Sequence, residues 1–241
     1  VDALTHAKIT TGLNENKFGL ALEDTLPAIR RAASLTNIQF IGLHFHIGSQ
    51  ITKLDSYRKL CIRINELQSS LEEEGIFVPT LNVGGGLGVN YTAPDTEAIP
   101  DFASYFTIFK QELQLREGQS VHFELGRSIV AQCGSLISRV LYVKEGHSKR
   151  FVIVDAGMTD LIRPAMYGST HQIDNLSHPE APKASFDVVG PICESSDVFA
   201  TDYVMPTPQR GDLLAFRSAG AYGEIMASQY NCRRLPGHIA E

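Results

Sequence analysis

Cysteine is scarce in this sequence, with four such residues among 241. Cys61, Cys133, Cys193 and Cys232 lie far apart and form no Cys-x-x-Cys pair, so neither a zinc knuckle nor a disulfide framework is expected. A reducing cytoplasm is therefore the expected compartment. Apolar runs of the roughly 20 residues that a membrane helix needs are also missing. The start, VDALTHAKIT, lacks the basic end and apolar stretch of a signal peptide.

Positive charge is in short supply as well, because 21 Lys and Arg residues face 27 Asp and Glu residues, for a net charge of −6. Nucleic acids and anionic membranes both require clustered Lys and Arg, so neither is expected as a partner. Apolar residues make up 43% and charged residues 20%, close to a globular average. This composition excludes a disordered tail, a fibrous repeat and a disulfide-stapled miniprotein.

The first half of the chain alternates helix-like and strand-like segments. Apolar residues three and four positions apart predict helices over 24–34, 54–71 and 99–113. Short apolar runs between them predict strands over 38–46, 80–83 and 121–124. Strand–loop–helix units in series imply a parallel sheet with its helices packed outside.

The pattern changes after Arg127. Apolar segments separated by Gly, Pro and Asp turns predict strands over 129–144, 151–155, 186–189 and 212–217. The stretch 169–184 has little apolar periodicity and is expected to be a long loop or cover segment. The second half is therefore expected to form a β-rich domain.

Polar or glycine-rich segments follow each expected strand of the first half, namely HFHIGS, GGGLG and ELGR. Parallel strands bind ligands at their carboxyl ends, so these three segments are expected to lie close together. About three strand–helix units fit before the break, against roughly eight in a closed barrel. Because proteins avoid open sheet edges, we expect an upstream piece of chain.

Three consecutive glycines, Gly84, Gly85 and Gly86, let backbone N–H groups approach an anion closely, as a phosphate cradle requires. The segment is not a dinucleotide-binding fingerprint, because Val89 stands where the last glycine belongs. It is not a P-loop either, since no Gly-Lys-Ser/Thr follows. A plain tight turn is the alternative to phosphate binding.

His44 and His46 lie two apart on an expected strand and so share a face. Paired histidines of this kind hold a divalent metal in some hydrolases. Alternatively, one imidazole packs flat on an aromatic cofactor and the other is structural, or both are structural. Ser49 either donates its hydroxyl to a phosphate or caps a turn.

Charged side chains near strand ends offer further chemistry. Glu124 and Arg127 form either a structural ion pair or a site in which the carboxylate faces a protonated ring nitrogen and the guanidinium holds an anion. Arg163 and Tyr167 share a face if their segment is helical, and suit a carboxylate, with surface decoration as the alternative.

Cys193, Glu194 and Tyr222 are the last candidates. A thiol beside a carboxylate is a poor nucleophile, because negative charge disfavours the thiolate, and it suits a proton donor better. Glu194 can bind an ammonium group. Tyr222 lies between glycines, where its hydroxyl either reaches an anion or forms part of a β-turn.

Six segments together resemble the diaminopimelate decarboxylases, fold-type III enzymes that depend on pyridoxal phosphate. They are HFHIGSQI, NVGGGLGV, FELGRSIVA, DAGMTDLIRPAMYG, VVGPICESSD and SAGAYGEIMASQYN, in the order of that family. The resemblance extends from ITTGLNENKFG to the C-terminus. It implies an α/β fold in which the C-terminal part of a (β/α)8 barrel, residues 1–127, precedes a β-rich barrel- or sandwich-like domain, residues 128–241.

The resemblance also implies a role for each candidate in binding pyridoxal 5'-phosphate. His46 would stack on the cofactor ring, and Glu124 would pair with the pyridine nitrogen and keep it protonated. The phosphate would be held by Ser49, Gly84, Gly85 and Gly86. The remaining cofactor-binding residues would be Gly126, Arg127 and Tyr222. No metal site is implied.

For the substrate, the resemblance implies decarboxylation of meso-2,6-diaminopimelate to L-lysine and CO2, the last step of lysine biosynthesis. Carboxylate binding would fall to Arg127, Arg163 and Tyr167, with Tyr222 between substrate and cofactor phosphate. Glu194 would bind the distal amino group, and Cys193 would reprotonate the carbanion, so that Cys193 and His46 are the catalytic residues. A cytoplasmic homodimer with shared active sites is implied, since the loop of Cys193 enters the partner's site in this family.

Two departures from the family pattern stand out. The family's Schiff-base lysine lies upstream of every segment quoted above, so we expect this piece of chain to be inactive alone. Leu125 stands where the family often has Pro, and the tail RRLPGHIAE deviates from the usual ending.

Three other readings remain. Decarboxylases of ornithine, arginine or carboxynorspermidine share the HIGS, GGG and E-x-G-R elements, but Arg163 favours a substrate with a second carboxylate. A metal-dependent hydrolase would use His44 and His46 and leave GGGLG and ELGR unexplained. A non-catalytic homologue would retain the fold without the lysine.

Overall fold

A computed structural model describes residues 17–96 and 100–240, which form two compact units. The first unit contains residues 17–88 and 100–126, and the second contains 89–96 and 127–240. The segment ITTGLNENKFG and the predicted helix 99–113 both begin outside the described residues. The predicted division into domains 1–127 and 128–241 stays a prediction.

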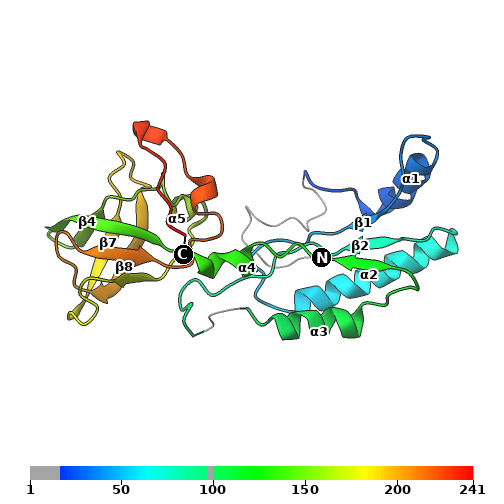
Figure 1. The fold of residues 1–241 in the computed structure, drawn as a ribbon, viewed down its shortest axis with the longest axis horizontal. Coiled ribbons are helices and arrows are strands. Elements are labelled where there is room, and N and C mark those ends of the chain that lie inside the picture. The colour runs from blue at the N-terminus through cyan, green and yellow to red at the C-terminus, as the bar shows by residue number, and fades with distance from the viewer. Residues whose placement is uncertain (1–16, 97–99, 241) are drawn as a thin grey trace. The chain divides into compact units, whose positions relative to one another are not determined.

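The first unit is a three-stranded parallel sheet with helices, as the sequence predicted (Figure 1). Its elements are α1 (Leu22–Ala33), β1 (Gly42–His44), α2 (Asp55–Glu73), β2 (Thr80–Asn82), α3 (Phe102–Glu112) and β3 (Ser120–His122). The strands follow the order β1-β2-β3, with Gly42 opposite Thr80 and Thr80 opposite Ser120. All three strands therefore end at one edge of the sheet, so the segments that follow them meet there.

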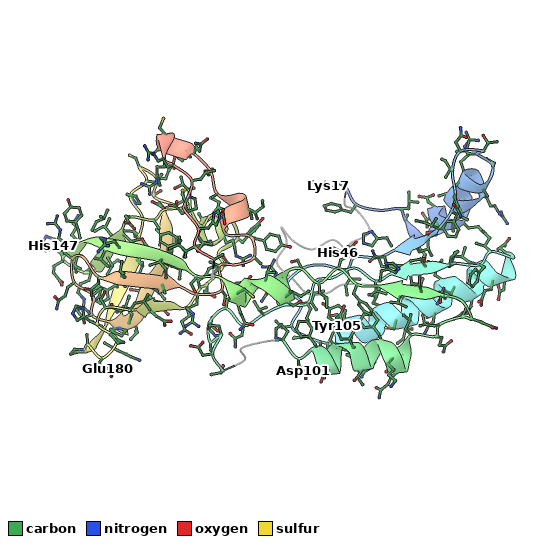
Figure 2. The ribbon with its side chains drawn as sticks, in the orientation of Figure 1. Lys17, His46, Asp101, Tyr105, His147 and Glu180 are labelled. Carbon is green, nitrogen blue, oxygen red and sulfur yellow. The ribbon has the colours of Figure 1, made fainter. Side chains whose placement is uncertain are left out.

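Helices α2 and α3 lie side by side and cover the apolar core of this unit (Figure 1). The carboxylate of Asp101 accepts a hydrogen bond from the Ser104 N–H at 2.9 Å and caps the start of α3. Tyr105 on α3, labelled in Figure 2, is fully buried and meets the ring of Tyr57 edge-on at 4.8 Å. Aromatic rings thus fasten α3 to α2 and the sheet.

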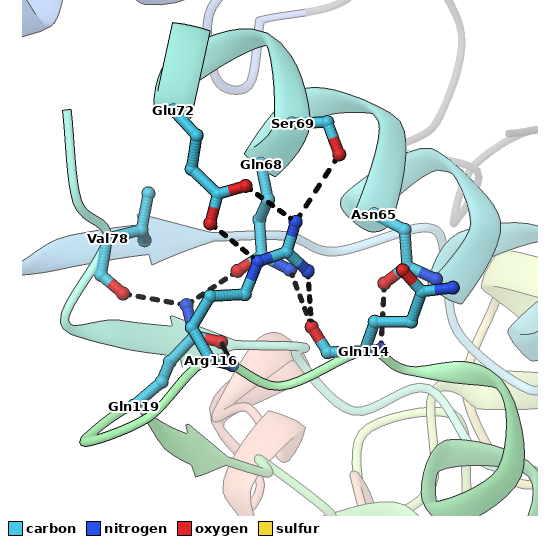
Figure 3. A network of polar contacts seen from close by, with 8 residues as sticks. All are labelled: Asn65, Gln68, Ser69, Glu72, Val78, Gln114, Arg116 and Gln119. Carbon is cyan, nitrogen blue, oxygen red and sulfur yellow. Dashed lines mark hydrogen bonds and ion pairs between the residues drawn. The ribbon is translucent and has the colours of Figure 1, made fainter. Parts of the chain in front are cut away.

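A polar network joins α2 to the loop before β3, away from the carboxyl ends of the strands (Figure 3). The guanidinium of Arg116 donates to both carboxylate oxygens of Glu72, at 2.7 and 3.0 Å, and to the Gln114 carbonyl at 2.6 Å. The Gln119 amide donates to the Val78 carbonyl at 2.7 Å. These contacts stabilise the end of the sheet at which the strands begin.

The second unit is a β-rich domain. Its helical elements are α4 (Arg127–Val130), η1 (Ala131–Cys133), α5 (Arg163–Tyr167), η2 (Glu224–Met226) and η3 (Tyr230–Cys232). Its strands are β4 (Leu136–Glu145), β5 (Arg150–Val154), β6 (Ile173–Asn175), β7 (Lys183–Val189), β8 (Val198–Pro206) and β9 (Leu213–Phe216), in the sheet order β6-β9-β4-β5-β7-β8.

The sheet of this unit curls until its outermost strands, β6 and β8, meet. The Tyr203 hydroxyl on β8 accepts a hydrogen bond from the Ile173 N–H at 2.9 Å and lies 3.4 Å from the Ile173 carbonyl. The Tyr203 side chain thus bonds to the edge of β6 where a neighbouring strand would otherwise pair. The sheet is therefore a nearly closed barrel. Its interior is filled by large apolar side chains such as Phe186, Leu214 and Phe216.

Two predictions for the second half were wrong. The predicted strand 129–144 begins as helix, and β4 starts only at Leu136, because the carbonyls of Ala131 and Gly134 accept hydrogen bonds from the Gly220 and Ala219 N–H groups. The stretch 169–184 is not wholly a loop, since it contains β6 and the start of β7. In addition, β8 was not anticipated.

Within the described residues, no helix is long and apolar enough to cross a membrane.

Replacing Arg116 by Met is expected to lower the free energy of unfolding by more than a control substitution does. The guanidinium loses its two-pronged contact with Glu72 together with its hydrogen bond to the Gln114 carbonyl. Arg63→Met is the matched control, since Arg63 on α2 makes a single contact with Glu66 on an exposed surface. The control should change stability by less than about 0.5 kcal/mol. Urea unfolding followed by circular dichroism measures both. Equal effects of the two substitutions would contradict this reading of the network.

Candidate functional site

The segments after β1, β2 and β3 pack backbone against backbone in the first unit. A Cβ atom on Gly84 would lie 2.3 Å from the Phe45 carbonyl oxygen, and one on Gly85 would lie 2.0 Å from the Glu124 carbonyl oxygen. Gly84 and Gly86 also have φ angles of +72° and +89°, which favour glycine. The three glycines are therefore required by close approach and backbone conformation, beyond what a plain turn demands.

Glu124 lies where these segments meet, with its carboxylate held from two sides. Its Oε2 lies 3.2 Å from the Nε2 of His44, and its Oε1 accepts a hydrogen bond from the Asn82 amide at 3.0 Å. The Oδ1 of the same Asn82 side chain accepts a hydrogen bond from the Gly84 N–H at 2.9 Å. One amide thus connects the carboxylate to the glycine segment. Half of the Glu124 side chain is exposed, so the carboxylate is accessible to a ligand.

His46 lies just beyond the end of β1 (Figure 2), close to Gly84. Partial burial and the nearby His44 lower its pKa, whereas Glu124 opposes this shift. A lowered pKa keeps the imidazole neutral near pH 7, which suits stacking on an aromatic ring. Ser49 is half-buried and follows Gly48, whose carbonyl lies against Gly86. The structure thus brings the predicted residues of this unit together.

In the second unit, two arginines gather around one phenol. Helix α4 supplies Arg127, whose Nη1 donates to the Tyr91 hydroxyl at 2.6 Å. Helix α5 supplies Arg163, whose guanidinium carbon lies 4.6 Å from the centroid of the Tyr91 ring. The Arg127 guanidinium also lies 4.7 Å from the ring centroid of Tyr222. These contacts are cation–π interactions, which attract a cation without neutralising it.

The charge of Arg163 is poorly compensated. Its side chain is 4% exposed, and burial together with the nearby Arg127 lowers its pKa, against the effect of Tyr91, Tyr167 and Tyr222. Within residues 17–96 and 100–240, no carboxylate forms an ion pair with Arg163. A buried cation without an anion is costly. The segment 163–167 is helical, so the condition under which Arg163 and Tyr167 share a face is met.

His171 completes this cluster. It is 4% exposed, its Nδ1 lies 2.8 Å from the Arg217 carbonyl oxygen, and its Nε2 lies 3.4 Å from the Nε of Arg163. Burial is the main cause that lowers its pKa, to about 4. His171 is therefore a neutral imidazole at pH 7.

Cys193 and Glu194 lie on a loop that Asp197 holds in shape. The buried Asp197 carboxylate accepts hydrogen bonds from the Ile192 N–H at 2.7 Å and the Met158 N–H at 2.6 Å. The Cys193 thiol is free and exposed. The Glu194 carboxylate accepts a hydrogen bond from the Tyr230 hydroxyl at 2.6 Å, and this contact raises the pKa of Tyr230.

Four residues of the site were missed by the sequence analysis: Asn82, Tyr91, His171 and Tyr230. Asn82 and Tyr230 lie inside quoted segments, NVGGGLGV and SAGAYGEIMASQYN, where a polar residue beside a motif was the available signal. Tyr91 and His171 carry no local signal, because each meets Arg163 only through the fold. At Gly126 an added Cβ would meet open space, so its predicted role cannot depend on close packing.

The hypothesis of a metal-dependent hydrolase is not supported by a set of metal ligands. In the part of the chain that the structure describes, no three side chains of His, Cys, Asp or Glu come together in a way that could hold a metal ion. His44 instead pairs with Glu124.

Comparison with known proteins identifies the class. The family model described as "Pyridoxal-dependent decarboxylase, C-terminal sheet domain" matches residues 20–220. The chain belongs to this family, as the resemblance of its motifs implied.

Its relatives narrow the assignment. The chain is 58% identical to the diaminopimelate decarboxylase of Bacteroides thetaiotaomicron, covering 98% of this chain and 61% of that protein. The crystal structure of diaminopimelate decarboxylase from Helicobacter pylori complexed with L-lysine is similar at a TM-score of 0.87 and 41% identity, covering 96% of this chain and 57% of that one. A lysine/ornithine decarboxylase of Vibrio vulnificus complexed with cadaverine gives a TM-score of 0.80 at 27% identity, covering 91% and 58%. The chain thus spans about three fifths of the length of these relatives.

Gly85→Ala is expected to lower the free energy of unfolding by about 1–3 kcal/mol, because the new methyl group overlaps the Glu124 carbonyl and one backbone must shift. Gly237→Ala is the control, since an added Cβ there meets nothing within 4 Å. Denaturant unfolding measures both. If both variants are as stable as the parent, the strand-end segments are not packed as closely as described.

Acid should destabilise the protein through His171. Its pKa is lowered from 6.5 to about 4 in the folded state, so between these values the unfolded chain binds the proton and the folded chain does not. The contribution of neutral His171 to the free energy of unfolding is complete above pH 6.5. It is lost as the pH falls toward 4, at up to about 1.4 kcal/mol per pH unit. Unfolding free energies from pH 7 to 4.5 should show this slope, and His171→Gln should flatten it. An unchanged slope in the variant would assign the effect to other groups.

Proposed function

We propose that this chain belongs to an enzyme that decarboxylates meso-2,6-diaminopimelate to L-lysine and CO2 with pyridoxal 5'-phosphate. The observation that carries the proposal is Arg163, a buried guanidinium with three phenols around it and no carboxylate partner within the described residues. A diacid amino acid supplies the missing anion. Tyr167, one turn further on α5, and Arg127 complete the carboxylate-binding group.

The residues at the strand ends of the first unit fit the cofactor. Glu124, held by His44 and Asn82, presents a fixed carboxylate to a pyridinium N–H. The neutral imidazole of His46 offers a flat face for stacking. When bound, the cofactor supplies an electron sink for the pair of electrons that CO2 leaves behind.

The phosphate of the cofactor is assigned to Ser49 and to the segment of Gly84, Gly85 and Gly86. The Gly84 N–H already donates to Asn82, so the N–H groups of Gly85 and Gly86 are the candidate donors. The positive φ angles of Gly84 and Gly86 support this role, because such a turned backbone can direct successive N–H groups to one anion. Gly126, Arg127 and Tyr222 are assigned to the same cofactor. Tyr222 carries a φ of +58°, an uncommon conformation for a tyrosine, and the residue is 41% exposed.

Proton transfer and recognition of the distal amino group are assigned to the loop of Cys193. The exposed thiol holds a proton at Sγ and delivers it to the carbon from which CO2 has left. Glu194, oriented by the Tyr230 hydroxyl, binds the ammonium group. Asp197 stabilises the loop that presents both residues.

We further propose that the enzyme is a cytoplasmic homodimer, in which the loop of Cys193 serves the partner's site. Its exposed position supports this assignment. Mass photometry of the full-length gene product tests the oligomeric state, and a monomer at micromolar concentration would refute it.

The alternative is a decarboxylase of ornithine, arginine or carboxynorspermidine. The chain's 27% identity to the Vibrio vulnificus enzyme, against 58% to the Bacteroides protein, favours the diaminopimelate assignment. Arg163 favours it too, because the side chains of ornithine and arginine carry no second carboxylate.

The test is CO2 release by the full-length gene product with added pyridoxal phosphate, from meso-diaminopimelate, lysine, ornithine and arginine. Release from diaminopimelate alone is expected. Cys193→Ala should lower kcat by about a hundredfold or more, as loss of a general acid does, and Cys133→Ala is the matched control at another exposed cysteine. Release from ornithine or arginine instead would overturn the substrate assignment, and no release at all would overturn the activity.

A further inference from the structure

Arg163 is a long, flexible side chain that the structure holds from two directions. The face of the Tyr91 ring supports the guanidinium at 4.6 Å. The Nε2 of His171 lies 3.4 Å from its Nε. The ring contact fixes the distance of the guanidinium from Tyr91, and the contact with His171 limits its rotation in the plane.

The direction of the second contact follows from the hydrogen-bond chemistry of His171. A carbonyl oxygen only accepts, so the contact between Nδ1 and the Arg217 carbonyl at 2.8 Å requires the proton on Nδ1. In a neutral imidazole Nε2 then carries a lone pair and accepts from the Arg163 N–H. The lowered pKa of His171, caused mainly by burial, maintains this state at neutral pH.

His171 is itself firmly anchored. Its ring meets the Tyr91 ring nearly edge-on, at 5.0 Å between centroids and 69° between planes. Arg217, whose backbone carbonyl accepts the hydrogen bond from Nδ1, forms ion pairs with Asp174 at 2.9 Å and Asp95 at 2.8 Å. The imidazole is therefore a rigid support for the guanidinium.

We propose that His171 is a positioning residue that orients Arg163 for a carboxylate of the substrate, and so contributes to selection of a diacid amino acid. The inference rests on the proposed function, in which Arg163 binds the carboxylate that basic amino acids lack. The Nε of Arg163 is engaged by His171, so the carboxylate of the substrate meets the two terminal nitrogens of Arg163, Nη1 and Nη2. A lysine in place of Arg163 could not offer this two-pronged contact.

Two substitutions separate positioning from simple packing. In His171→Asn the amide nitrogen can still donate to the Arg217 carbonyl, but the shorter side chain does not reach Arg163. In His171→Gln the amide oxygen extends to the depth of Nε2 and can accept from Arg163. His147→Asn, in the exposed turn between β4 and β5 (Figure 2), is the matched control.

The full-length gene product with pyridoxal phosphate is assayed for CO2 release. Calorimetry measures binding of L-lysine, which keeps the carboxylate on the carbon that does not react, and of cadaverine, which has no carboxylate. His171→Asn should raise KM for meso-diaminopimelate about tenfold, the effect of losing a hydrogen bond to a charged group. Its affinity for L-lysine should fall by a similar factor. Its kcat and its affinity for cadaverine should stay within about twofold, because the lost interaction is made only to the retained carboxylate and is the same in ground and transition states. His171→Gln should recover most of the loss, and His147→Asn should match the parent.

A His171→Asn variant that loses affinity for cadaverine as strongly as for L-lysine, or that lowers kcat to the same extent, would overturn the inference, as would equal effects of Asn and Gln. If the parent decarboxylates diaminopimelate and no His171 variant changes KM, the inference fails and the proposed function stands. If the parent releases no CO2 from diaminopimelate, the proposed function fails instead.

The positioning contact is tested independently of activity by NMR of protein with ¹⁵N-labelled histidine at pH 7. His171 should carry its proton on Nδ1, and Arg163→Met should shift its Nε2 resonance. A proton on Nε2, or a resonance that does not respond to Arg163→Met, would overturn the inference whatever the enzyme assay gives.

Discussion

The burial of two guanidinium groups around one phenol is the constraint on which the second unit depends. Arg127 bonds to the hydroxyl of Tyr91, and Arg163 lies over its ring. Like charges in a buried site repel each other, and no protein carboxylate within the described residues neutralises Arg163. Phenol rings and a neutral imidazole offset part of this cost. In the proposed function, a carboxylate of the substrate offsets the rest of this cost.

The first unit follows a different principle, in which backbone atoms rather than side chains set the geometry. Gly84, Gly85 and Gly86 allow three chain segments to approach within distances that any side chain would forbid. Asn82 then links this backbone arrangement to the carboxylate of Glu124. In the proposed function, cofactor binding therefore depends on rigid strand ends, whereas recognition of the substrate depends on side chains of the β-rich unit.

The sequence predicted those parts of the fold whose causes are local. The spacing of buried residues along α2 and the glycine run after β2 are examples. Other parts have distant causes: β4 begins late because Gly220 and Ala219 bond to the carbonyls before it. Tyr91 lies 36 residues from its partner Arg127. The role of His171 depends on the carbonyl of Arg217, which determines which ring nitrogen carries the proton. Motif resemblance named most of the candidate site, but it could not name the residues that support it.

The line along which the outermost strands β6 and β8 meet, called the seam below, determines where a domain of this kind can gain a strand. At this one line the sheet is closed by the Tyr203 phenol rather than by a ladder of backbone hydrogen bonds. An additional strand inserted there would pair with two free edges and leave every existing strand pairing intact. Elsewhere an insertion would have to separate strands that already pair. The seam is therefore the place where evolution or protein engineering can enlarge the barrel without changing its register.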